Sequence, residues 1–178
     1  MAKRISLDAL LLAIALIIFV LEAQIPPLIP IPGVKLGLAN IVTVYALFRT
    51  GARDAFAILI CRILLGCVFS GQIMALLFSL GGGLFCFGAM LLLKRYLSEK
   101  QLWICSVIGA VFHNLGQMTV ALLFFQTTAI LAYLPVLIIS GIVTGAFTGI
   151  CAQLLINRLG GRAPADEKRG RGKRPLAS

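Results

Sequence analysis

Six long apolar stretches, separated by short polar or Gly/Pro-rich breaks, occupy most of this chain of 178 residues. Hydrophobic residues make up 60% of it and charged residues only 12%. A soluble domain of this size cannot hide so many apolar side chains, because a small globule exposes much of its surface. A helix of about 20 apolar residues crosses a bilayer, and continuous rather than alternating runs favour helices. We therefore predict an all-α, polytopic membrane protein, a six-transmembrane-helix bundle with spans near residues 5–23, 36–50, 54–70, 73–93, 102–125 and 134–157.

The charge distribution predicts the orientation of the bundle. The net charge is +10, and with the N-terminus inside, all Lys and Arg residues except Lys35 and Arg62 fall on the cytoplasmic side. Because cytoplasmic loops are rich in Lys and Arg, we expect a multi-pass protein of the bacterial cell (inner) membrane with both termini cytoplasmic. Residues 1–159 are expected to form the membrane domain and residues 160–178 a disordered polybasic tail. Attraction to anionic lipid headgroups explains this tail better than nucleic-acid binding.

Breaks and small residues mark the expected connections between helices and the expected helix contacts. The first apolar stretch is expected to remain as a helix, because no clear small-x-small cleavage site follows it. Residues 25–33 contain four prolines, which exclude a helix. This segment is either a cover over a cavity at the outer face or a plain interfacial connector. Gly141, Gly145 and Gly149 form a stripe that favours close helix packing over ligand binding.

Polar residues at membrane depth are costly and usually face a cavity or a partner. The fifth stretch carries such residues on one helical face, and the second and third stretches add an amide and a guanidinium group. We predict that the ligand-facing residues are Lys35, Asn40, Arg62, His113, Asn114 and Gln117. The alternative is a purely structural hydrogen-bond network between helices.

The predicted cavity has a positive sign. Lys35 and Arg62 have one acidic neighbour in the outer half of the bundle, Glu22. A buried cation without a partner is expensive, so an anionic ligand group such as a carboxylate or phosphate would complete the site. The alternative is an ion pair of Glu22 with Arg62 or with Lys35.

Several kinds of chemistry are missing from the sequence. It has no phosphate-binding Gly-rich loop ending in Lys-Ser/Thr and no evident nucleophile–base pair, so we expect no enzyme and no cofactor. Five cysteines without a C-x-x-C pair, and a single His, predict neither a disulfide framework nor a metal site.

Two motifs resemble a known family. Residues 32–43 (Pro-Gly-Val-Lys-Leu-Gly-Leu-Ala-Asn-Ile-Val-Thr) and residues 113–117 (His-Asn-Leu-Gly-Gln) are similar to signatures of the Gx transporter family, also called heptaprenyl diphosphate synthase component I. That family is similar in layout to the S components of energy-coupling factor transporters. The resemblance implies a partner-docking face at Ala9 and Ala13, a transmembrane coupling subunit and separate ATPases. It also implies that the Pro-rich segment covers the ligand.

Together these observations predict a membrane-embedded binding and uptake component for a small anionic organic molecule, such as a vitamin, a flavin or a prenyl or quinone precursor. One alternative is a non-catalytic membrane accessory of heptaprenyl diphosphate or quinone synthesis, since the acidic residues form none of the Asp-rich motifs of prenyl diphosphate synthases. The other is a membrane subunit of quinone- or flavin-linked extracellular electron transfer.

Overall fold

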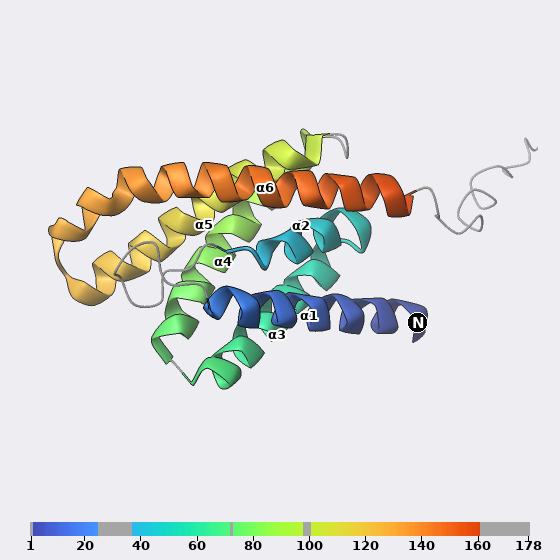
Figure 1. Cartoon of the computed structure of the whole chain (residues 1–178), viewed down its shortest axis with the longest axis horizontal. Coiled ribbons are helices and arrows are strands. Elements are labelled where there is room, and N and C mark those ends of the chain that lie inside the picture. The colour runs from blue at the N-terminus through green and yellow to red at the C-terminus, as the bar shows by residue number, and fades with distance from the viewer. Residues whose placement is uncertain (1, 25–36, 72, 98–100, 161–178) are drawn as a thin grey trace, which may run out of the picture.

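The fold is a bundle of helices, shown in Figure 1. The computed structural model describes residues 2–24, 37–71, 73–97 and 101–160, and no strand occurs in this part of the chain. The helices are α1 (Ala2–Ala23), α2 (Asn40–Arg49), α3 (Ala52–Ser70), α4 (Ile73–Lys94), α5 (Leu102–Phe125) and α6 (Leu134–Gly160), with a 3-10 helix η2 (Thr128–Tyr133) before α6. The all-helical prediction is confirmed. The Pro-rich segment 25–33, Lys35 and the tail beyond Gly160 lie outside the described residues.

Only part of the six-span prediction is confirmed. Among the described residues, four helical segments are long and apolar enough to cross a membrane: Ile5–Glu22, Ile73–Lys94, Leu102–Phe125 and Thr128–Arg158. Helix α2 has 10 residues, so it rises about 15 Å, half the thickness of the hydrocarbon core. Helix α3 is longer but carries Arg53, Asp54 and Arg62. The sequence pattern located all six helices, yet it overestimated how many have the length and apolarity of a complete span.

The short helix α2 lies at the centre of the bundle and contacts each of the other five α-helices. Seven of its ten residues are buried. Side chains satisfy two of its C-terminal carbonyl groups, because Lys94 Nζ of α4 donates to the Leu47 carbonyl and Thr50 Oγ1 to the Ala46 carbonyl. A helix so enclosed fixes the position of its first residue, Asn40, relative to the surrounding helices.

Glycines bring α4, α5 and α6 into close contact. A Cβ atom on Gly116 of α5 would lie 2.5 Å from the Gly81 carbonyl oxygen of α4. Similarly, a Cβ atom on Gly145 or Gly149 of α6 would lie 2.7–2.8 Å from a Cα atom of α5. Side chains of this size do not fit, so the backbones can approach only because these residues lack them. The packing role predicted for the glycine stripe is confirmed.

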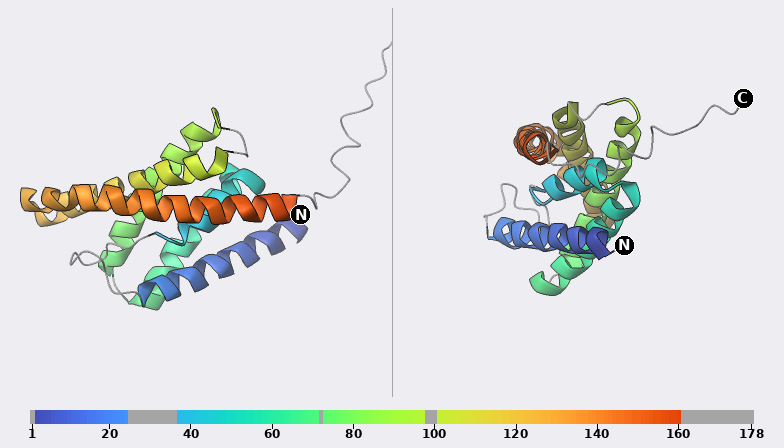
Figure 2. Two further views of the ribbon diagram at one scale, coloured as in Figure 1. Left: turned by 45° about the horizontal axis from the view of Figure 1, so that its top comes forward. Right: turned by 90° about the vertical axis from the view of Figure 1, so that its right-hand side faces the viewer.

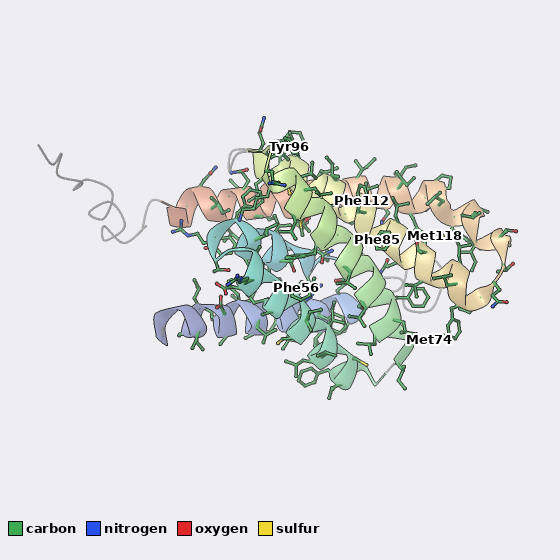
Figure 3. All side chains as sticks on the ribbon, turned by 180° about the vertical axis from the view of Figure 1, so that it is seen from behind. Phe56, Met74, Phe85, Tyr96, Phe112 and Met118 are labelled. Carbon is green, nitrogen blue, oxygen red and sulfur yellow. The ribbon has the colours of Figure 1, made fainter. Side chains whose placement is uncertain are left out.

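The outer surface of the bundle is apolar. Large hydrophobic side chains are exposed on every α-helix but the enclosed α2, and Figure 3 shows Phe56, Phe85 and Phe112 on the outside. Such a surface suits lipid tails rather than water. The start of α1 and the end of α6 lie at the same end of the bundle (Figures 1 and 2). This arrangement is compatible with both termini on one side of the membrane, and which side it is stays a prediction.

Candidate functional site

A small polar cavity lies where the end of α1 and the residues before α2 meet α3, α4 and α5. Its lining consists of Phe19, Glu22, Gly37, Arg62, Ile63, Ser79, His113 and Gln117. The cavity volume is about 20 Å³. This is room for about one water molecule. The cavity therefore gathers side chains from four α-helices around one small space.

Arg62 is the cation of this cavity. It lies in α3 and is 4% exposed. Its Nη2 atom donates a hydrogen bond to Oδ1 of Asn40, the first residue of α2, at 3.2 Å. The guanidinium group thereby joins α3 to the central short helix, and the two predicted site residues Asn40 and Arg62 are brought together.

Glu22 contributes a carboxylate to the same cavity. It belongs to the last turn of α1, is 5% exposed, and its Oε1 atom accepts a hydrogen bond from the backbone N–H of Gly37. The carboxylate also interacts electrostatically with Arg62. Glu22 and Arg62 thus line the same cavity, whereas Lys35, the other predicted partner of Glu22, lies outside the described residues.

The polar stripe of α5 divides between two neighbours. His113 and Gln117, one turn apart, both face the cavity and are buried. Asn114 is also buried, but its Nδ2 atom donates to the Leu137 carbonyl of α6 at 2.6 Å. Consecutive residues of a helix point about 100° apart, so the side chains of His113 and Asn114 cannot both face the same small cavity. The geometry assigns Asn114 to the contact between α5 and α6, and its role as a ligand residue has no support from its position.

Several buried polar atoms of this region have no hydrogen-bond partner among the described residues. They are Thr43 Oγ1, Arg62 Nε, His113 Nδ1 and Gln117 Oε1. The ring of His113 packs against the Gly82 backbone, which leaves no room for a side chain there. Buried polar groups in folded proteins are almost always hydrogen-bonded, and leaving one unpaired costs about 1–3 kcal/mol. Three of these four residues line the cavity.

Four lining residues had no role in the sequence-based site, and one of them, Ile63, is an apolar residue in an apolar stretch. Ser79 of α4 gave no signal, because serine in an apolar helix commonly bonds to its own backbone. Phe19 was one of many aromatic residues in apolar stretches. Gly37 lies within the signature motif, and its φ of +77° requires glycine. A Cβ atom there would also lie 3.0 Å from Asn40 Nδ2 and 3.2 Å from His113 Cδ2. Because Gly37 belongs to the signature motif, its position beside the cavity could have been predicted from the sequence.

The predicted partner-docking residues lie on the outer face of α1. Ala9 and Ala13 are exposed, whereas Leu11, Ala15 and Phe19 on the opposite side are buried against the bundle. Small residues on an exposed helix face allow another helix to approach closely. Their docking role stays a prediction. Within the described part of the chain, no three His, Cys, Asp or Glu side chains gather as metal ligands would.

Comparison with known proteins gives one match. A family model described as heptaprenyl diphosphate synthase component I matches residues 11–155, a range that includes every residue of the cavity. No curated protein and no solved structure matches the chain. The similarity to S components of energy-coupling factor transporters therefore stays a prediction.

Proposed function

The chain belongs to the heptaprenyl diphosphate synthase component I family, and from this premise we propose that it is a membrane-embedded binding component for a small organic molecule with an anionic group. In this proposal the anionic group binds at Arg62, and Asn40, His113, Gln117 and Ser79 orient the rest of the ligand by hydrogen bonds. The protein would lie in the bacterial cell membrane and take up its ligand with the help of separate subunits. We include Lys35 in the proposal as a second cation for the anionic group of the ligand.

The single observation that supports this function is the group of unpartnered polar atoms around one cavity. Arg62 Nε, His113 Nδ1 and Gln117 Oε1 come from two helices and are all buried. Hydrogen bonds between helices would pair such atoms with one another if their only purpose were to hold the bundle together. A guanidinium group suits carboxylate and phosphate oxygens in particular, because it offers several donors in one plane.

The proposal is tested by identifying what the protein retains. We would purify it in a mild detergent and analyse it by native mass spectrometry, with Arg62→Gln as the variant and Arg158→Gln as the control, since Arg158 is exposed at the end of α6. We expect wild type and control to retain the same small molecule and Arg62→Gln to lose it while remaining folded. Equal retention by all three proteins would contradict the assignment of the site.

Uptake requires an energy source that this sequence does not contain, so we propose a transmembrane coupling subunit and ATPases as partners. Exposed small residues on α1 support a helix-docking face there. Ala9→Leu combined with Ala13→Leu should abolish co-purification of an ATPase from membranes of the native host. Ala57→Leu, on the exposed face of α3, is the matched control. Co-purification unaffected by the double substitution would rule out this docking face.

A second candidate is a membrane accessory of heptaprenyl diphosphate synthesis, and the description of the family favours it. Component I would then act with a separate catalytic subunit. The two candidates differ in their partners, because a soluble synthase subunit should co-purify in the second case and ATPases in the first. Both allow an anionic ligand at Arg62, so the identity of the partner decides between them.

A further inference from the structure

The carboxylate of Glu22 occupies the position in which a ligand anion would be expected. It accepts the Gly37 N–H bond just before α2 and lies in the cavity of Arg62. Of the eight lining residues it is the only one with an acidic side chain. A carboxylate at this position accepts a backbone N–H bond and interacts electrostatically with a guanidinium group, and donors of both kinds bind oxyanions in proteins.

The cavity is too small to hold a ligand anion in addition to the Glu22 carboxylate. A volume of about 20 Å³ accepts a water molecule but not a carboxylate or phosphate group of several heavy atoms. An anion of this size needs more room beside Arg62 than the cavity offers, and the departure of a lining group would provide it. Glu22 is suited to leave, because it lies in the last turn of α1, where the helix ends at Ala23.

We propose that Glu22 is an internal anion that the anionic group of the ligand displaces from Gly37 and Arg62. The inference rests on the proposed function and adds the mechanism by which the site opens. The incoming oxyanion takes over the Gly37 N–H donor and uses Arg62 Nε, which has no hydrogen-bond partner, while Arg62 Nη2 keeps its bond to Asn40. An oxyanion with at least two oxygens can use both donors together.

Competition of this kind weakens ligand binding in a predictable way. A ligand binds only to the fraction of molecules in which the carboxylate has left, so the apparent Kd is the intrinsic Kd divided by that fraction. Glu22→Gln keeps a neutral acceptor for Gly37 but removes the competing charge. This variant should therefore bind anions more tightly than the wild-type protein.

The experiment uses inorganic pyrophosphate as the probe and the full-length chain in phosphatidylcholine nanodiscs. Binding is measured by calorimetry for wild type, Glu22→Gln and Arg62→Gln, with Asp54→Asn as a control for loss of an acidic residue outside the cavity. We expect Glu22→Gln to bind at least tenfold more tightly than wild type, Asp54→Asn to match wild type, and Arg62→Gln to lose binding. A Glu22→Gln protein that binds no more tightly than wild type, or does not bind, would overturn the inference. The retention experiment on the native ligand would then still decide the proposed function separately.

Infrared difference spectra distinguish displacement from simple repulsion. Addition of pyrophosphate to the wild-type protein should shift a carboxylate stretching band, and the band should be absent from the difference spectrum of Glu22→Gln. Tighter binding by the variant without a band shift in wild type would mean that Glu22 repels the anion but stays in place. That result would also overturn the inference.

Discussion

Arg62 of α3 donates a hydrogen bond from Nη2 to Oδ1 of Asn40 at 3.2 Å, and this bond joins a buried cation to the first residue of the central helix α2. The two bonded residues are 22 positions apart in the sequence and belong to different apolar stretches. Arg62 thereby contacts the start of α2, and Lys94 contacts its end.

Asn40→Ala should lower the stability of the bundle. Hydrogen bonds to charged groups contribute about 1.5–3 kcal/mol, and the loss of this one leaves a buried guanidinium group with fewer partners. Thermal unfolding in nanodiscs measures the effect. Asn157→Ala is the matched control, because Asn157 is exposed and bonds only to Gln153 among the described residues. Its effect should stay within about 0.5 kcal/mol. Equal melting temperatures for the two variants would show that the bond between Asn40 and Arg62 contributes nothing.

Asn114 and Gln117 should respond differently to substitution although both lie on α5. Asn114→Ala removes the bond to Leu137 and should loosen α6 without changing which molecule the protein retains. Gln117→Leu removes a buried amide that lines the cavity and should reduce ligand retention at least tenfold without loss of stability, since its Oε1 atom has no partner to lose. Retention is measured by native mass spectrometry. If Asn114→Ala lost the ligand to the same extent, Asn114 would belong to the site.

Gly116→Ala should separate α4 from α5. The added methyl group would meet the Gly81 carbonyl oxygen at 2.5 Å, so the backbones must move apart at a cost of about 1–3 kcal/mol. Gly88→Ala is the control, because a Cβ atom on Gly88 of α4 meets nothing within 4 Å. That variant should be neutral or gain about 0.5–1 kcal/mol, since alanine has the higher helix propensity. Unfolding temperatures should fall for the first variant only, and a fall of equal size in both would contradict the role of the glycine contact.

Lys94→Met should weaken the end of α2. The ammonium group donates to the Leu47 carbonyl, and a cation at a helix C-terminus is also favoured by the helix dipole. We expect faster amide hydrogen exchange over residues 46–50 and a lower unfolding temperature. Arg95→Met, which changes an exposed neighbour, should leave both unchanged. Exchange rates that do not differ between the two variants would show that Lys94 does not hold α2.

The sequence predicted the helices well because helix formation depends on residues that are neighbours in the chain. Long apolar runs in a solvent without hydrogen-bonding partners must satisfy their own backbone, so the residues 73–93 and 102–125 expected as spans appear as α4 and α5 with nearly the same ends. Helix α2 was expected as a span over residues 36–50, but it begins only at Asn40. Its length depends on capping by Lys94 and enclosure by other helices, which are contacts between distant parts of the chain.

The sequence by itself determined that the surface of this protein suits lipid, that its fold is helical, and which few polar residues are available to build a site. It did so because hydropathy and helical periodicity are properties of neighbouring residues. Only the tertiary structure decided that Arg62, Asn40, His113 and Gln117 come together, that Asn114 turns to α6, and that Glu22 lines the same cavity as Arg62. Rotation and depth of each helix arise from side-chain packing across helices, and such packing is set by residues far apart in the sequence.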